Sequence, residues 1–123
     1  MAFKTQSHKD LIAWQKSIQL VEIIYKMTQT FPKEELYGLT SQVRRATVSV
    51  AMNIAEGTGA DSDGELKRFL VMAARSCYEV MCGIEVAMRL QYLAHQQGEK
   101  LLDRVEELSA MIHGFVRKLR AGR

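Results

Sequence analysis

The sequence predicts an all-α protein, a four-helix bundle in which the chain runs up, down, up and down in antiparallel order. Apolar residues recur every three or four positions in four separate segments, which is the spacing of an amphipathic helix. The breaks between these segments are short and contain either glycine or the single proline of the chain. Helices joined by short connections pack as antiparallel neighbours, so four of them make a bundle.

Length and composition indicate one globular domain. The chain has 123 residues, of which 47% are hydrophobic and 25% are charged, as in an ordinary folded domain. We expect the domain to cover residues 1–123, with flexible ends at 1–8 and 120–123. The formal net charge of +3 permits a nucleic-acid or acidic partner without requiring one.

The sequence also bears on the compartment. It shows neither a signal peptide nor an apolar run of about 18 residues, so we expect a cytoplasmic protein with no membrane partner. Cys77 and Cys82 are five positions apart and point in different directions on a helix, so they cannot bond to each other. We expect reduced thiols that both act as small core residues.

The first helix is expected from Lys9 to Phe31, because Pro32 disfavours helix in the residue before it. It carries two apolar rows, which together are wider than one neighbouring helix requires. The helix therefore either touches two partners inside the bundle or uses one row as an oligomer surface. The first row is Leu11, Trp14, Ile18, Val21, Tyr25 and Thr28, and the second is Leu20, Ile24, Met27 and Phe31.

A short turn over 33–36 and Gly38 lead into the second helix, which is expected to end at Gly57. Thr40 or Ser41 can cap its start, and Gly57 can supply the left-handed residue that ends it. The segment from residue 46 to residue 55 carries no charge, so we expect this helix to be surrounded by others.

A polar row follows one stripe of this helix, and we call it the polar row. Unpaired buried polar groups are costly, so such a row needs specific partners. It is either a hydrogen-bond network that locks two helices together or a patch that faces a ligand or partner. Glu56 adds to this need, because the helix dipole disfavours an anion in the last turn. The members are Gln42, Arg45, Ser49, Asn53 and Glu56.

The third helix is expected from Asp63 to Leu93. Ser62 and Glu65 form a capping box at its start, and Gly83 marks a place where another helix comes close. A break over residues 96–98 precedes the fourth helix, which is expected from residue 99 to residue 119. Its apolar residues are Leu101, Val105, Leu108, Ile112, Phe115 and Leu119.

The sequence lacks the patterns that mark catalytic or metal sites. No histidine lies three residues after a glutamate, which disfavours a di-iron bundle, and no His-Glu-x-x-His or Cys-x-x-Cys is present to hold zinc. No phosphate-binding glycine loop follows a strand pattern, and no serine or cysteine has a histidine at a suitable helical offset. We therefore expect no catalytic residue, no metal and no cofactor, and thus no enzyme.

Basic residues are the remaining candidates for a function. Their alternative roles are solvated helix faces and, at the end of the chain, compensation of a helix dipole. Arg44 and Arg45 point about 100° apart, and by spacing Arg45 follows the polar row while Arg44 is freer. Arg45 and Glu79 of the facing helix are a plausible buried ion pair. The candidate nucleic-acid contacts are Arg44, Lys67, Arg68, Arg75, Arg117, Lys118 and Arg120.

One long motif carries a resemblance to a known family. It reads Leu39-Thr40-x-Gln42-x-Arg44-Arg45-Ala46-x-x-Ser49, followed by Asn53-Ile54-Ala55-Glu56-Gly57. Flanking positions such as Trp14, Tyr25, Phe31-Pro32 and Ser76-x-x-Glu79 extend it over residues 10 to 93. The sequence resembles the 23S rRNA intervening-sequence proteins, also called the four-helix bundle protein family. It departs at Ala51, where family members often carry proline.

The resemblance implies a bacterial protein that assembles as a homopentameric barrel with a basic surface. It also implies RNA or DNA binding, or binding to a reverse transcriptase as in the accessory proteins of diversity-generating retroelements. Our leading hypothesis is a non-enzymatic homo-oligomer that contacts nucleic-acid phosphates without reading bases. The alternative is an interaction scaffold for another protein, with no nucleic-acid contact.

Overall fold

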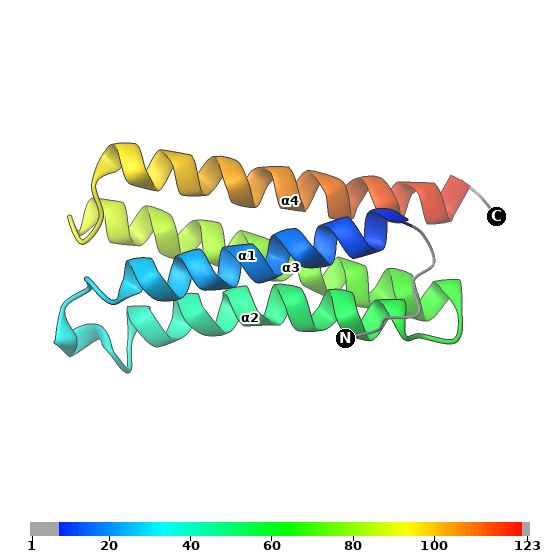
Figure 1. Ribbon diagram of the computed structural model, residues 1–123, viewed down its shortest axis with the longest axis horizontal. Helices are drawn as coiled ribbons and strands as arrows, with labels where there is room; N and C mark the ends of the chain where they lie inside the picture. Colours follow the sequence, from blue (N-terminus) through cyan, green and yellow to red (C-terminus); the bar gives the residue numbers. More distant parts are fainter. Residues whose placement is uncertain (1–7, 122–123) are drawn as a thin grey trace.

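The computed structural model describes residues 8–121, with side chains described from residue 12 to residue 119, and shows four α-helices in antiparallel order (Figure 1). The α1–α2 and α3–α4 connections lie at one end of the bundle and the α2–α3 connection at the other. The predicted fold class is confirmed. The expectation of flexible ends concerned residues 1–8 and 120–123, most of which lie outside the described residues. The elements are α1 (His8–Thr28), the short 3-10 helix η1 (Lys33–Glu35), α2 (Leu39–Thr58), α3 (Asp63–Arg89) and α4 (His95–Ala121).

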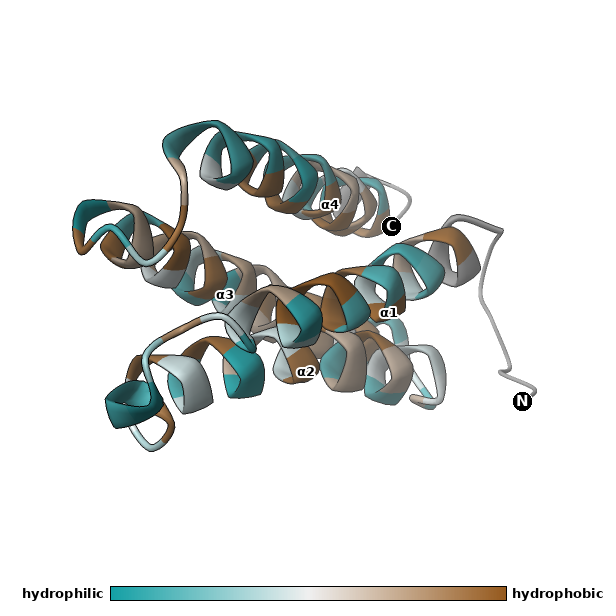
Figure 2. Ribbon diagram, turned by 60° about the vertical axis from the view of Figure 1, so that its left-hand side comes forward, coloured by the Kyte–Doolittle hydropathy of each residue, from teal (hydrophilic) through white to brown (hydrophobic). Residues whose placement is uncertain are grey.

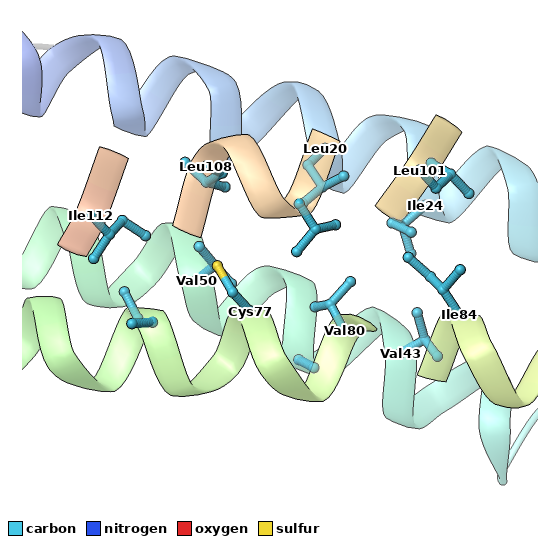
Figure 3. Close-up of a cluster of buried hydrophobic side chains, with 14 of the residues drawn as sticks. Leu20, Ile24, Val43, Val50, Cys77, Val80, Ile84, Leu101, Leu108 and Ile112 are labelled. Carbon is cyan, nitrogen blue, oxygen red and sulfur yellow. The ribbon is translucent and has the colours of Figure 1, made fainter. Parts of the chain in front are cut away.

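Every helix contributes side chains to one hydrophobic core (Figure 3). Burying a valine, leucine or isoleucine contributes about 1.5 to 3 kcal/mol, so this core is the main source of stability. The hydropathy of α4 changes across its width, from hydrophilic outside to hydrophobic toward the bundle (Figure 2). The largest side chains with almost no exposure are Ile24, Val43, Val50, Ile54, Leu66, Val80, Ile84, Val105 and Ile112.

The second apolar row of α1 faces the core. Leu20, Ile24, Met27 and Phe31 are buried, whereas Ile18 and Val21 of the first row are half-buried and Tyr25 is 41% exposed. The helix ends at Thr28, three residues earlier than expected, because the chain turns before Pro32: the N–H of Phe31 donates to the Thr28 carbonyl at 3.1 Å. Ile18, Val21 and Tyr25 of the first row therefore lie along the edge of the bundle, whereas Thr28 of the same row is buried.

The cap of α2 comes from a residue before the helix. The N-cap position is Gly38, which has no side chain to cap the helix, and Thr40 is buried inside the first turn. The expected cap by Thr40 or Ser41 is therefore wrong. Instead, Glu35 Oε1 accepts a hydrogen bond from the Leu39 N–H at 3.1 Å. A side chain on Gly38 would bring its Cβ within 2.8 Å of that oxygen, so glycine makes room for the cap.

The expected role of Gly57 is also wrong. The helix continues to Thr58, and among the described residues no glycine has a positive φ. Gly57 is buried, and an added Cβ would lie 3.0 Å from Leu66 Cδ1 and 3.2 Å from Phe69 Cβ. Glycine is present here because α3 passes close by, not because the chain turns.

The start and the middle of α3 agree with the sequence analysis, but its end does not. Ser62 Oγ accepts from the Glu65 N–H at 3.2 Å, and a Cβ on Gly83 would lie 2.5 Å from Val43 Cγ2. The helix ends at Arg89 rather than Leu93, because Gln91 adopts a left-handed φ of 64°. The Tyr92 N–H donates to the Ala87 carbonyl at 2.9 Å, as in a Schellman cap.

The expected break over residues 96–98 lies inside α4. This helix begins at His95, four residues earlier than expected. Gly98 is buried in its first turn, where any side chain would collide with the Met88 sulfur of α3. As with Gly57, a residue that looked like a chain break serves a close helix contact.

Candidate interaction site

The polar row that the sequence places on α2, the α2 polar row, lies on the outward face of the helix, beside an open groove of about 550 Å³, which we call the α2 groove. The prediction that α2 is enclosed therefore holds for only one side. Val50, Ala51 and Ile54 are buried, but Met52 is 60% exposed. The groove is lined by Tyr25 of α1, Phe69 of α3 and, from α2, Arg45, Val48, Ser49, Met52, Asn53 and Glu56.

The middle of the row is a hydrogen-bond network. The Ser49 and Ser76 hydroxyl oxygens are 2.9 Å apart, which links α2 to α3. Asn53 Nδ2 donates to the Ser49 carbonyl at 2.9 Å and to Ser49 Oγ at 3.0 Å. These contacts satisfy the half-buried polar groups that the sequence placed here.

The charged ends of the row have no such partners. Arg45 and Glu56 are exposed, and neither makes a hydrogen bond or an ion pair within residues 12–119. Arg45 and Glu79 line one polar hollow of about 400 Å³ together with Gln42, yet they form no ion pair. The expected Arg45–Glu79 pair and the expected compensation of Glu56 are both wrong, because this face is open to solvent.

Arg44 is the arginine that the fold uses. Its Nε donates to Thr28 Oγ1 at 2.8 Å, and its Nη2 donates to the Tyr25 carbonyl at 3.3 Å. Its guanidinium also lies 4.7 Å from the centre of the Tyr25 ring. A cation at the C-terminal end of α1 is favourable for the helix dipole. The expectation that Arg44 is the freer residue is wrong, since the position of α1 could not be read from α2 alone.

Other basic residues meet at one end of the bundle because α3 and α4 are antiparallel (Figure 1). The first turns of α3 carry Lys67 and Arg68, and the last turns of α4 carry Arg117 and Lys118. We call these four residues the cationic end. Lys67 is half-buried and the others are exposed, while Arg75 is exposed two turns further along α3. The side chain of Arg120 lies outside the described residues.

Arg68 is partly engaged within its own chain. Its Nη2 lies 3.1 Å from Glu65 Oε1, and its guanidinium lies 4.6 Å from the centre of the Phe69 ring. Both groups of the ion pair remain half-exposed, so the pair contributes little to stability. Arg68 therefore stays at the surface, where it contacts Glu65 and Phe69 of its own helix.

An exposed row on α3 was not predicted from the sequence, which pointed only to single charged residues on this side of the helix. Met72 and Val86 are 39% and 40% exposed, whereas the large hydrophobic residues described on α4 are all at least partly buried. The three- and four-residue spacing of these positions was the signal that could have revealed the row. We call it the α3 outer row: Met72, Arg75, Glu79, Cys82 and Val86.

The two cysteines differ, contrary to the expectation that both lie in the core. Cys77 is buried, and burial raises the pKa of its thiol to about 12. Cys82 is exposed on the α3 outer row. Only Cys77 is therefore a core residue.

Two further findings concern metals and membranes. Among the described residues, no three side chains of His, Cys, Asp or Glu come together in a way that holds a metal ion. Over the same residues, no helix combines the length and apolar character needed to cross a membrane.

Together, the fold and the site define a protein of the antiparallel four-helix-bundle class, with an open groove along α2 and a cationic end. The chain belongs to the 23S rRNA-intervening sequence protein family, whose pattern matches residues 9–114. It is similar in structure to a protein with unknown function from the S23 ribosomal protein family of Bacteroides thetaiotaomicron VPI-5482. The TM-score is 0.83 over 89% of this chain and 98% of that one, with 21% identity, which supports the fold alone. Comparison with curated proteins gives no match.

Proposed function

We propose that this protein is a non-enzymatic homo-oligomer that binds the phosphate backbone of RNA or DNA. The observation that carries the proposal is the cationic end, where the half-buried Lys67 and three exposed basic residues of α3 and α4 lie at the same end of the bundle (Figure 1). Phosphate contacts supply most of the affinity in binding that does not depend on sequence. Basic residues from two helices at the same end can offer several phosphate contacts, although Asp63 and Glu65 in the first turn of α3 stand at that end too.

Self-association would multiply this surface. The family resemblance implies five subunits, which would turn a net charge of +3 into about +15 per assembly, and repeated weak contacts add up to tighter binding. The partly exposed first row of α1 and the α3 outer row supply apolar surface for contacts between subunits. A ring requires that two different faces meet, and these two rows lie on different helices.

The test is fluorescence anisotropy with labelled RNA and DNA duplexes between 50 and 200 mM salt. We expect binding that weakens linearly in log–log form as salt rises, with little preference between sequences. The triple variant Lys67→Ala/Arg117→Ala/Lys118→Ala should reduce the salt slope by about two to three, because each phosphate contact contributes about 0.9 to it.

The matched control removes three exposed cations toward the opposite end of the bundle, Arg89→Ala/Lys100→Ala/Arg104→Ala. This control variant loses the same three positive charges as the triple cationic variant. The proposal requires that it keep most of the wild-type salt slope. Equal losses in both triple variants would mean a general charge effect, and absence of binding at 50 mM salt would overturn the nucleic-acid role.

A second candidate is a scaffold that binds another protein, such as a reverse transcriptase, without nucleic-acid contact. The α3 outer row favours it, because Met72 and Val86 expose apolar surface that phosphate binding does not use. Three results together would support this candidate. Binding to a protein partner should persist from 50 to 500 mM salt, it should be lost in Met72→Asp/Val86→Asp, and it should be retained in the triple cationic variant.

A further inference from the structure

An aromatic pair lies on the outer surface where α3 and α4 meet, and we call it the α3–α4 aromatic pair. The Tyr78 hydroxyl lies 3.2 Å from His113 Nε2, and the two ring centres are 6.1 Å apart with their planes tilted by 39°. His113 is half-buried, and Tyr78 is 54% exposed. The pair links two helices, yet it leaves aromatic surface in contact with solvent.

Three other rings with accessible surface are placed differently. The Arg44 guanidinium lies 4.7 Å from the centre of the Tyr25 ring, and the Arg68 guanidinium lies 4.6 Å from the centre of the Phe69 ring. Tyr37 is 93% exposed, but it lies in the α1–α2 connection, at the end of the bundle opposite to the cationic end. Within residues 12–119, by contrast, no lysine or arginine covers the tyrosine of the α3–α4 aromatic pair.

Two exposed arginines lie one turn from the pair. Arg75 precedes Tyr78 by three residues and Arg117 follows His113 by four, which is about 4.5 to 6 Å along each helix axis. At about 100° per residue, these arginines are turned by only about 60° and 40° from the rings, so each shares a helix face with its ring. Because α3 and α4 are antiparallel, both arginines lie on the side of the pair that leads to the cationic end (Figure 1).

Acidic residues lie on the other side of the pair. Glu85 follows Tyr78 by seven residues, Glu106 precedes His113 by seven, and both are exposed. Glu79 is next to Tyr78 in the chain, but it is turned by about 100° and lines the polar hollow beside α2. A polyanion that reaches the pair is therefore favoured to extend toward the cationic end and not away from it.

We propose that the α3–α4 aromatic pair is a stacking platform for an unpaired base of single-stranded RNA or DNA, with the adjoining phosphates over Arg75 and Arg117. A row of cations for the backbone, combined with aromatic side chains on which bases stack, is the usual chemistry of single-strand binding. Every base has an aromatic face, so such stacking tolerates any sequence. The bases of a duplex are stacked on one another and are not free to cover Tyr78.

This inference rests on the phosphate binding in the proposed function and names the form of nucleic acid that the surface prefers. A duplex has the higher charge density, so phosphate contacts alone would hold it at least as tightly as a single strand. Stacking adds a contribution that only a strand with unpaired bases gains. Comparison of the two forms therefore separates the platform from phosphate binding.

Fluorescence anisotropy at 50 mM salt tests the platform with two labelled probes, an oligo-dT strand of about 20 nucleotides and a DNA duplex of the same length. Tyr78→Ala should weaken binding of the strand by about fivefold or more, as expected for loss of a ring that stacks on a base, and binding of the duplex by less than about twofold. Tyr78→Phe keeps the ring and should stay within about twofold of wild type for both probes.

The salt slope separates stacking from charge. Tyr78→Ala removes no cation, so its slope for the strand should equal that of wild type, whereas the triple cationic variant should lower the slope for both probes. A third probe, a strand of equal length made of abasic nucleotides, should bind wild type and Tyr78→Ala equally. Tyr37→Ala is the matched control, because it removes an exposed tyrosine at the opposite end of the bundle and should change none of these affinities.

Circular dichroism would establish that each variant is folded. Three results would each overturn the platform and leave phosphate binding in place: a Tyr78→Ala variant that binds the strand as tightly as wild type, an equal loss for strand and duplex, or an equal loss in Tyr78→Phe. Absence of binding to both the strand and the duplex in wild type would overturn the platform together with the proposed function.

Discussion

Adjacent arginines of α2 have different roles because a helix turns by about 100° between them. Arg44 points to α1 and donates hydrogen bonds to Thr28 and Tyr25. Arg45 points to solvent beside the α2 groove. The chemistry of the two side chains is identical, so their surroundings decide which one stabilises the fold and which one is available to a partner.

Replacing Arg44 should therefore affect stability and replacing Arg45 should not. Arg44→Ala removes two charge-assisted hydrogen bonds from a half-buried position, and we expect a loss of about 1 to 2 kcal/mol in the free energy of unfolding. Arg45→Ala should stay within about 0.5 kcal/mol of wild type when the protein is monomeric. Urea unfolding followed by circular dichroism at low protein concentration measures both, and equal effects would contradict the assigned roles.

Tyr92 links the two connections at one end of the bundle. Its hydroxyl donates to Glu35 Oε2 at 2.9 Å, and its ring centre lies 5.7 Å from that of Phe31. The other oxygen of Glu35 caps α2, so one carboxylate serves a helix end and a tertiary contact. The hydrogen bond to Glu35, together with burial and the nearby carboxylates of Glu35 and Glu34, raises the pKa of Tyr92 above its usual value of 10.0.

This raised pKa predicts a loss of stability at alkaline pH. The folded state holds the Tyr92 proton more tightly than the unfolded chain does, so the stabilisation is complete below pH 10 and declines as the pH rises through the folded pKa. Tyr92→Phe should be less stable than wild type at pH 8, and the difference should shrink above pH 10. Urea midpoints measured from pH 8 to 11 test this prediction. The control is Tyr37→Phe, because the Tyr37 side chain is 93% exposed.

At the scale of the helices, contacts from other elements set where several of them begin, end and approach. Glu35 caps α2 from the preceding connection, and α3 ends where Gln91 turns the chain. Gly57, Gly83 and Gly98 lie inside helices, each at a point where a neighbouring helix comes close. Glycine lowers helix propensity by about 1 kcal/mol relative to alanine, so its presence at these positions reflects the space that the neighbour requires.

Gly83 and Gly114 provide a matched pair of helix-interior substitutions. Gly83→Ala would place a Cβ 2.5 Å from Val43 Cγ2, and the resulting displacement should outweigh the gain in propensity, for a net loss of about 1 to 2 kcal/mol. In Gly114→Ala the nearest atom is the flexible Arg117 Nη2 at 3.8 Å, so we expect a gain of about 0.5 to 1 kcal/mol.

Thermal unfolding of both alanine variants would measure the contrast. Combining Gly83→Ala with Val43→Ala should recover part of the loss, because the truncated residue leaves room for the new methyl group. A neutral or stabilising Gly83→Ala would mean that α2 and α3 can separate at no cost.

At the scale of the whole molecule, the packing is not uniform around the bundle. An apolar hollow of about 560 Å³ lies where α1 and α4 meet, and its lining includes Ile12, Leu70, Met111 and Phe115. In contrast, α3 is packed between α2 and α4 and buries residues along its whole length. The α1–α4 contact is therefore the least filled part of the core.

Native-state hydrogen exchange should follow this difference. We expect the slowest amide exchange in α3 between Ala73 and Ala87, at rates that approach global unfolding. Within α4, the half that lines the hollow, residues 107–115, should exchange faster than residues 101–106, none of which lines it. Uniform protection along α4 would show that the hollow does not weaken the structure locally.

Much of the fold is readable from local periodicity. The core positions of α4 other than Leu119, the Ser62 cap and the close approach at Gly83 were all predicted, because each depends on spacing or on a few neighbouring residues. The α2 polar row was found for the same reason. The exposure of the α2 polar row was not predicted. The absence of charge from residue 46 to residue 55 does not tell how many neighbours surround the helix.

By itself, then, the sequence determined that this protein has four helices, most of the residues that face its core, and which polar residues share a stripe. These properties follow from the 3.6-residue period of a helix, which acts over one or two turns. Only the tertiary structure decided that Arg44 holds α1, that Arg45 and Glu56 stay uncompensated beside the α2 groove, and that basic residues of α3 and α4 meet at one end. Those outcomes depend on the positions of neighbouring helices. Contacts between residues far apart in the chain determine these positions.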